Sequence, residues 1–373
     1  MKQYEIGEKS VNILAEEMDI GADITWGQNV SIEARQVIIG SSATIGSNVR
    51  IKGEYIFIAT RAQIQDDVSI SSSYFSLGYR SRVETRCQIS GMGTPSAEHI
   101  VIGDVSLLAS DCRVFIPVLK VGDYVKIHNH TLINGRKACV IGHNSGIFQN
   151  NILNGEDTLI IGNHVGLGIY TSVWTHAYFG DLLEGCNTFE VSPTFIGDDV
   201  WVVGAYNVIA PGVHIGDKAM VLTHSYVNKD VPSNHCVAGI PAKDITNKIK
   251  PFRVISLDEK FSMMFTYIED FLRIQYPRSF ITTSGGFHIL RDTRQFKVIF
   301  MDIAYDEQIG EDVEKLIITK ENCTRQDYKR VTIFDLNRRE YTKRLTDPEV
   351  ELIYFLLSYR ARFTPAGHQK MEL

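Results

Sequence analysis

The chain has 373 residues, of which 44% are hydrophobic and 22% charged, and its formal net charge is −6. This composition is that of an ordinary soluble protein and gives no reason to expect a nucleic acid or an anionic membrane as partner. No apolar run is long enough to span a membrane, the first residues lack the apolar core of a signal peptide, and the six cysteines form no C-x-x-C pair. We therefore expect a cytoplasmic protein without a membrane span, a disulfide framework or a zinc knuckle.

Residues 1–19 carry no repeat, and VNILAEEM at 11–18 is expected to form a turn or two of helix. From residue 20 onward aliphatic residues recur at every sixth position, imperfectly at first with Ile20, Trp26 and Ile32. The regular triplets that follow contain only Ile, Leu and Val: Ile39/Ile45/Ile51, Ile58/Ile64/Ile70, Leu77/Val83/Ile89, Ile102/Leu108/Val114, Val121/Ile127/Ile133, Ile141/Ile147/Leu153, Ile161/Leu167/Val173, Ile196/Val202/Val208 and Ile215/Val221/Val227.

A period of six residues excludes an α-helix, because a helix would turn successive members of a triplet about 120° away from one another. It is typical of a parallel β-helix, in which each coil consists of three short strands and each strand points one residue inward. Glycine follows the first member of most triplets and is expected to let the backbone turn a corner. These glycines are Gly40, Gly78, Gly103, Gly122, Gly142, Gly162, Gly197 and Gly216. A twisted β-sandwich is the alternative, but its strands would be spaced irregularly.

Two segments interrupt the repeat at the same predicted corner, four coils apart. One is the loop Ser90–His99, and the other is WTHAYFGDLLEGCNTFEVSP, between Val173 and Ile196. Because stacked strands are about 4.8 Å apart, the two excursions should leave the solenoid about 19 Å from each other. Long loops on a rigid scaffold usually serve ligands or partners.

The composition changes near residue 250, and residues 251–373 are expected to form a small α+β domain of unknown role. Ser256 and Glu259 form a capping box that opens a helix extending to about Tyr276. The runs FHILRD, FKVIFMDIAYD, EKLIITKE and RVTIFDL resemble strands, and a second helix should begin at Thr346-Asp347-Pro348. Residues 20–250 are then the β-helix, with about nine to ten coils.

The segment Ile161–Asp244 resembles the hexapeptide-repeat acyltransferases, most closely the branch of galactoside, maltose and xenobiotic acetyltransferases. The matching words are IGDDVWVVGAYNVIAPGVHIGD and VNKDVPSNHCVAGIPAKDI, whereas the upstream coils match only in period. The resemblance implies a left-handed β-helix, a homotrimer, acetyl-CoA or another acyl-CoA as donor, and a sugar or nucleotide-sugar as acceptor.

The same resemblance makes His176 the general base, since in that branch a histidine stands just ahead of such an excursion. An imidazole can accept the proton of an attacking amine or hydroxyl at neutral pH. Glu156 lies three residues past Leu153, as His176 lies three past Val173, so Glu156 or its neighbour Asp157 is expected to orient the ring. The alternatives are a solvent-exposed loop histidine and a solvated carboxylate.

Further site residues are also implied by the resemblance. Trp201, Gly204 and Ala205 match the segment beside which pantetheine lies, where backbone N–H groups can stabilise an oxyanion. Lys243 matches a contact to coenzyme A phosphates. Trp201 could equally be a corner-packing aromatic, and Lys243 a solvated surface lysine.

Two asparagines and four histidines complete the candidates. Asn150 and Asn151 lie one coil below the His176 strand, where related enzymes present an amide to the acceptor, although asparagine is also a frequent corner residue. Some β-helix trimers hold zinc between subunits, and the histidines to consider for this are His128, His130, His143 and His164. They fall on different sides of the predicted prism, so no metal is expected.

The sequence thus predicts an acyl-CoA-dependent acyltransferase that acts on the amine of a sugar or nucleotide-linked amino sugar by direct transfer in a ternary complex. O-acetylation of a sugar hydroxyl or surface glycan is the second hypothesis. A catalytically inactive trimer that serves as a scaffold is a third, from a different functional class.

Overall fold

The computed structural model describes residues 2–188, 190–278, 280–281, 286–291, 294–301, 313–320 and 330–367. The chain forms two compact units, of which the first ends at Phe252 and the second begins at Arg253. Each unit is described by itself.

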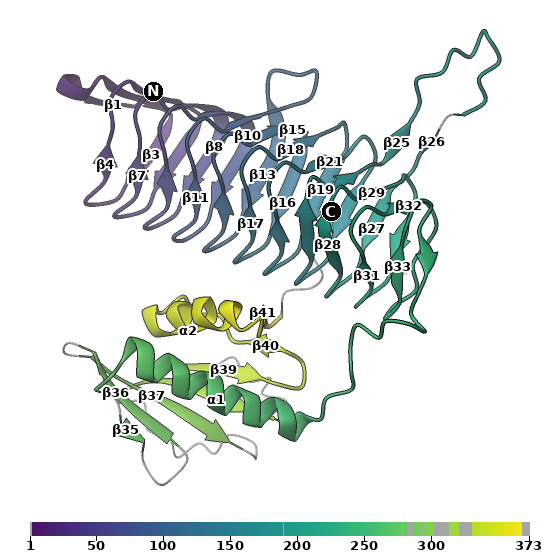
Figure 1. Ribbon diagram of the computed structural model, residues 1–373. Coiled ribbons are helices and arrows are strands. Elements are labelled where there is room, and N and C mark those ends of the chain that lie inside the picture. Colours follow the sequence, from purple (N-terminus) through teal and green to yellow (C-terminus); the bar gives the residue numbers. More distant parts are fainter. Residues whose placement is uncertain are drawn as a thin grey trace. The chain divides into compact units, whose positions relative to one another are not determined.

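The first unit is a parallel β-helix whose short strands stack into three faces (Figure 1). The first face contains β3 (Glu17–Ile20), β6 (Gln36–Ile39), the ends of β8 (Arg50–Ile58) and β10 (Ser69–Leu77), β13 (Ala97–Ile102), β16 (Val118–Val121), β19 (Ala138–Ile141), β22 (Leu159–Ile161), β27 (Thr194–Ile196) and β30 (His214–Ile215). The predicted mainly β, parallel β-helix class is confirmed.

The second face is a twelve-stranded sheet. It contains β4 (Thr25–Trp26), β7 (Thr44–Ile45), β9 (Gln63–Ile64), β11 (Arg82–Val83), β14 (Leu107–Leu108), β17 (Lys126–Ile127), β20 (Gly146–Ile147), β23 (Gly166–Ile169), β28 (Trp201–Ala205), β31 (Met220–Val221), β33 (Cys236–Ala238) and β34 (Lys243–Asp244). The last of these strands, β34, runs antiparallel to β33.

The third face completes each coil. It contains β2 (Val11–Ala15), β5 (Val30–Glu33), the beginnings of β8 and β10, β12 (Gln88–Ser90), β15 (Arg113–Phe115), β18 (Leu132–Asn134), β21 (Ile152–Asn154), β24 (Ser172–Val173), β29 (Val208–Ile209) and β32 (Tyr226–Val227). Inward residues of neighbouring coils pair in register, as Ile133 does with Leu153 and Leu153 with Val173. Their side chains fill the axis of the solenoid.

The prediction that Val208 points into the core is wrong. Ile209 is fully buried in the core, whereas its neighbour Val208 is only half-buried. The cause is an extra residue in β28, where the register with β23 shifts between Leu167 and Ile169. Gly204 takes a left-handed conformation there, with φ of +71°, which glycine adopts without steric cost.

The helix expected near the N-terminus is also wrong. Strand β1 (Lys2–Ile6), a short 3₁₀ turn (Gly7–Lys9) and β2 form an antiparallel hairpin, and β2 pairs parallel with β5. Val11, Ile13 and Ala15 alternate into the core, so the segment follows the period of a strand rather than that of a helix. The solenoid therefore begins about ten residues earlier than the sequence repeat indicates, and β1 covers its first strand.

The glycine row has a different cause from the one expected. A Cβ on Gly122 would lie 2.7 Å from the backbone N of His143 in the next coil, so glycine is needed because the coils approach closely. The corner itself is turned two residues later by non-glycine residues with left-handed backbones, such as Tyr124 and Asn144 with φ of 56° and 55°.

The described residues of the second unit form two helices and a seven-stranded mixed sheet. Helix α1 (Leu257–Gln275) is capped by Ser256, which accepts a hydrogen bond from the Glu259 N–H, and α2 (Asp347–Ser358) has a proline in its first turn. The strands are β35 (Phe280–Ile281), β36 (Gly286–Arg291), β37 (Arg294–Met301), β38 (Glu314–Thr319), β39 (Val331–Asp335), β40 (Glu340–Tyr341) and β41 (Thr364–Pro365). The expected strand FKVIFMDIAYD continues past Met301 into residues outside the described ranges. Within those ranges no helix is long and apolar enough to cross a membrane.

One corner residue is strained, which generates a stability prediction. Val105 has φ of 55°, a conformation that is rare for a β-branched residue and common for asparagine. Because the left-handed conformation costs about 1–2 kcal/mol for ordinary residues, Val105→Asn should stabilise the protein by about 1 kcal/mol and raise its melting temperature. Val118→Asn, at a half-buried strand position, is the matched control and should lower it. A melting temperature for Val105→Asn at or below that of the unmodified protein would contradict the prediction.

Candidate functional site

The long excursion leaves the solenoid at the corner between the third and first faces. After β24, the strand β25 (His176–Ala177) pairs antiparallel with β26 (Glu190–Val191), and the arm extends away from the stacked coils (Figure 1). His176 lies at the base of this arm. The shorter loop between β12 and β13 leaves from the same corner, as the spacing predicted.

The imidazole of His176 is held by a buried amide. Its Nδ1 atom lies 2.8 Å from Oδ1 of Asn154, whose side chain is almost fully buried. The same oxygen accepts hydrogen bonds from the Thr175 hydroxyl at 2.9 Å and the Thr175 backbone N–H at 3.4 Å. Since a backbone N–H can only donate, the oxygen of Asn154 and not its NH₂ group faces the pair.

This contact determines where the ring carries its proton. An amide oxygen only accepts hydrogen bonds, so in the neutral imidazole of His176 the proton lies on Nδ1 and the lone pair on Nε2. The ring is half-buried, with Trp174 edge-on at 5.6 Å between ring centroids and Tyr178 at 4.8 Å on another side. In this tautomer the nitrogen that can accept a proton is Nε2.

The carboxylates expected to orient His176 have other partners. Glu156 accepts a hydrogen bond from the Tyr178 hydroxyl at 2.9 Å and forms an ion pair with Arg136 at 3.4 Å. The hydrogen bond to Glu156 raises the pKa of Tyr178. The carboxylate of Asp157 accepts from the backbone N–H of Thr158 at 2.7 Å. The orienting group is therefore Asn154, and Glu156 holds one of the aromatic rings beside the imidazole.

Asn154 is the residue that the sequence reasoning missed. Glu156 and His176 each lie three residues past a core residue, Leu153 and Val173. The prediction treated this equal spacing as a sign that the two side chains are in contact. The available signal was the pairing of outward-facing residues one coil apart, in which Asn154 lies above Asn134. Polar residues in such a row are candidates for burial beneath an excursion.

The residues implied for the acyl donor lie on the second face. Trp201 is 50% exposed, and its ring covers Gly166, where a Cβ would come within 3.3 Å of it. Gly204 forms the bulge, and the Ala205 N–H donates to the Thr223 hydroxyl at 3.2 Å. Lys243 is exposed on β34, at the end of the same sheet. The residues implied for the acyl donor thus share one face, with Lys243 three strands along the sheet from β28, and His176 lies at the corner opposite that face.

Asn150 and Asn151, which were expected to contact the acceptor, lie at the corner between β20 and β21. Asn151 is fully buried, with its Oδ1 accepting from the Thr171 N–H at 2.5 Å and its Nδ2 donating to the Phe148 carbonyl at 2.9 Å. Both ends of its amide therefore have partners within the fold, and the expectation that Asn151 binds an acceptor stays a prediction. Asn150 has φ of 60°, the left-handed geometry of a corner residue.

The four histidines considered for zinc do not converge. His143 accepts a hydrogen bond from the Asp123 N–H at 2.9 Å, and Nδ1 of His164 lies 3.2 Å from a carboxylate oxygen of Asp199. His128 stacks on Phe148. Among the described residues no three His, Cys, Asp or Glu side chains are grouped as metal ligands would be.

Comparison with known proteins finds relatives that match about a quarter of this chain or less. No protein-family profile matches the chain. The chain is 36% identical over 90 residues to a galactoside O-acetyltransferase of Escherichia coli, which covers 24% of this chain and 43% of that protein. It is 46% identical over 56 residues to a tetrahydropyridine-dicarboxylate N-acetyltransferase of Staphylococcus aureus, covering 15% and 23%. The chain spans less than half the length of either relative.

Solved structures include a hexapeptide-repeat acetyltransferase of Vibrio cholerae in complex with acetyl coenzyme A. It is 22% identical, covers 45% of this chain and 68% of the other, and has a TM-score of 0.26. The resemblance to galactoside and hexapeptide-repeat acetyltransferases noted in the sequence is confirmed by the curated relatives.

The role of Asn154 can be tested without any assumption about the reaction. In the unmodified protein, nitrogen-15 NMR of labelled histidine should report His176 with its proton on Nδ1. In Asn154→Ala the acceptor is lost, so the signal should shift toward the Nε2-protonated tautomer. The buried N–H of Thr175 also loses a partner, which should cost about 1–3 kcal/mol of stability.

Asn150→Ala is the control for this experiment, because Asn150 lies at another corner. It should leave the His176 tautomer unchanged. An Nδ1-protonated ring in Asn154→Ala would show that Asn154 does not set the tautomer.

Proposed function

We propose that this protein is an acyltransferase that moves an acetyl group from acetyl-CoA, or another acyl group from its CoA thioester, to a sugar. The observation that carries the proposal is the fixed imidazole of His176, whose Nε2 has its lone pair available while Nδ1 is held by Asn154. The curated relatives, which include O- and N-acetyltransferases, support the same reaction class.

In the proposed reaction both substrates are bound together. Nε2 of His176 removes a proton from the acceptor as its nitrogen or oxygen attacks the thioester carbonyl. The new C–N or C–O bond forms, the C–S bond breaks, and the leaving thiolate takes the proton back from the imidazolium. The oxygen of Asn154 stabilises the imidazolium by accepting its Nδ1–H, and no acyl-enzyme intermediate is required.

We further propose that the active site lies between protomers of a homotrimer. Within one chain, His176 is at the corner between the third and first faces, and the donor residues Trp201, Gly204 and Ala205 are on the second face. Parallel packing of solenoids around a three-fold axis would bring one protomer's His176 beside the second face of its neighbour. In that arrangement Lys243 is available to coenzyme A phosphates.

The acceptor group is proposed to be the amine of a sugar or nucleotide-linked amino sugar. A sugar hydroxyl is the second candidate, favoured by the relative that is a galactoside O-acetyltransferase. A general base serves both acceptors, because each must lose a proton during attack.

The enzyme hypothesis predicts that His176→Ala abolishes acceptor-dependent release of free thiol from acetyl-CoA. Removing a general base typically costs a factor of about 10²–10⁴ in rate. His214→Ala, at an exposed position on β30, is the matched control and should retain full activity. A panel of amino sugars, sugars and nucleotide-sugars would be assayed with both variants.

Equal thiol release by His176→Ala and the unmodified protein would remove His176 from the mechanism. Absence of release with every donor and acceptor, together with no binding of coenzyme A, would favour the scaffold hypothesis instead.

The nature of the acceptor atom gives a separate prediction. If an amine is acylated, the product is an amide and should survive alkaline hydroxylamine, which cleaves esters. The check is the mass of the product before and after this treatment, with an authentic O-acetyl sugar as control. Loss of the acetyl group from the enzymatic product would identify O-acetylation.

A further inference from the structure

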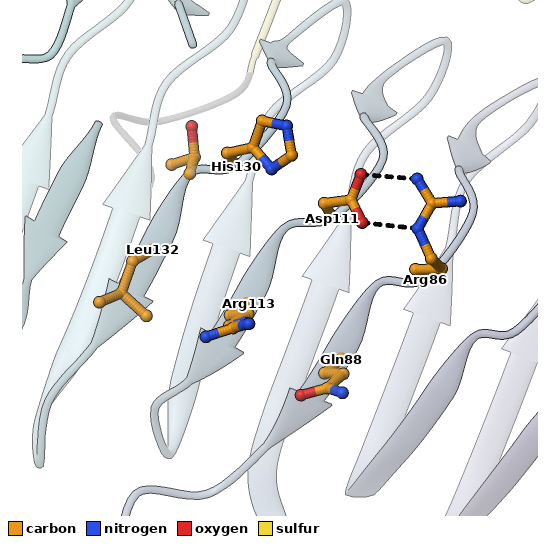
Figure 2. Close-up of a pocket in the computed structure, with 7 residues that line it drawn as sticks. Arg86, Gln88, Asp111, Arg113, His130 and Leu132 are labelled. Atoms are coloured by element: carbon orange, nitrogen blue, oxygen red, sulfur yellow. Dashed lines mark hydrogen bonds and ion pairs between the residues drawn. The ribbon is translucent and has the colours of Figure 1, made fainter. Parts of the chain in front are cut away.

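A cavity of about 580 Å³ lies at the corner between the second and third faces, whereas the excursion leaves from the corner between the third and first faces (Figure 2). Three successive coils line it, each with one residue at the corner and one on the third face. The corner row is Arg86, Asp111 and His130, and the face row is Gln88, Arg113 and Leu132, with Thr131 beside them.

Both rows are fixed by the backbone. The three corner residues have left-handed φ angles of 59°, 63° and 61°, so their side chains leave consecutive coils in the same direction. In the face row, Gln88 pairs with Arg113 and Arg113 with Leu132 in parallel register. Side chains therefore repeat along the cavity at the strand spacing of about 4.8 Å.

A bidentate ion pair forms one wall of the cavity. Arg86 donates from Nε and Nη2 to the two carboxylate oxygens of Asp111, each at 2.7 Å, as the dashed lines in Figure 2 show. The hydrogen bond from Arg86 holds the pKa of Asp111 below its usual range. The pair thus presents a rigid guanidinium and a charged carboxylate whose remaining lone pairs can accept hydrogen bonds.

Arg113 supplies a second positive charge next to this pair. Its side chain is exposed, and its charge contributes to lowering the pKa of Asp111. The residues that line the cavity carry two guanidinium groups and one carboxylate, and the carboxylate of Asp67, one coil before Arg86, also acts on the Arg86 guanidinium. A planar guanidinium is well suited to phosphate and carboxylate groups, which it can bind in bidentate fashion.

The remaining lining favours a hydroxylated ligand over an apolar one. Gln88 offers both an amide donor and an acceptor, Asp111 accepts, and among the described residues that line the cavity only Leu132 is aliphatic. The volume falls within the range of roughly 300–1,000 Å³ that is usual for small-molecule sites.

We propose that this cavity binds a sugar-sized, polyhydroxylated molecule that carries a phosphate or carboxylate group. The anionic group lies against Arg113 and the exposed edge of Arg86, and hydroxyl groups donate to Asp111 and exchange hydrogen bonds with Gln88. The site is separate from His176, which follows the opposite end of a third-face strand two coils beyond Leu132. Occupancy of the cavity therefore does not require the acyl-transfer reaction.

The test is calorimetric titration of the full chain with glucose 1-phosphate, glucuronate, inorganic phosphate and glucose. At least one anionic sugar should bind, and phosphate and carboxylate are distinguished by which of the two does so. Arg113→Gln should weaken that binding about tenfold to a hundredfold, the effect of losing a charge-assisted hydrogen bond. Arg82→Gln removes the same charge from an exposed position on the second face and should leave binding unchanged.

His176→Ala should also leave the binding unchanged, which separates the cavity from the proposed reaction. Circular dichroism of Arg113→Gln checks that the solenoid is intact. Failure of every probe to bind, or binding of inorganic phosphate or glucose as tight as that of the sugar anions, would overturn the proposal. Equal losses in Arg113→Gln and Arg82→Gln would overturn it as well, since they would show general charge attraction rather than a built site.

Discussion

The stacking of one coil on the next through backbone hydrogen bonds governs every other feature of the β-helix. Each inward residue lies directly above another inward residue, and each corner above another corner. The environment of a side chain is therefore set mainly by the residue one coil away rather than by its neighbours in sequence. The glycine row follows from this constraint, because a Cβ at Gly122 would collide with the backbone of the next coil.

The same constraint explains which parts of the fold were predictable. Inward positions must be apolar and of similar size, so a period of six reveals the solenoid without any structure. That inference failed at Val208, where one extra residue in β28 shifts the register and Ile209 takes the core position. It also failed at β2, where alternation over a few residues was too short to separate from a helical turn. A bulge or a hairpin changes only a few residues, so a repeat that extends over many coils does not predict it.

Side-chain partners outside the core were predicted less well, for a physical reason. The spacing located His176 at the base of the excursion but chose Glu156 as its partner, although Glu156 contacts Tyr178 and Arg136. Asn151 and Asn154 are the same residue type three positions apart. The Asn151 amide accepts a hydrogen bond from the backbone N–H of Thr171, whereas the Asn154 amide contacts the imidazole of His176. Whether an asparagine bonds to the backbone or to a side chain depends on the segment that lies over its amide. That is decided by the excursion, whose path the repeat does not encode.

The reversed strands at the two ends of the solenoid have a consequence for its length. Strand β1 runs antiparallel to β2 at the first coil, and β34 runs antiparallel to β33 after the last. Each places a strand of opposite direction where another molecule could otherwise continue the parallel ladder, so end-to-end polymerisation is discouraged. Since neither reversed strand depends on how many coils lie between them, whole coils can be gained or lost in evolution while β1 still covers β2 and β34 still covers β33. A coil gained or lost between β18 and β24 would change the distance between the arginine-lined cavity and His176 by one strand spacing.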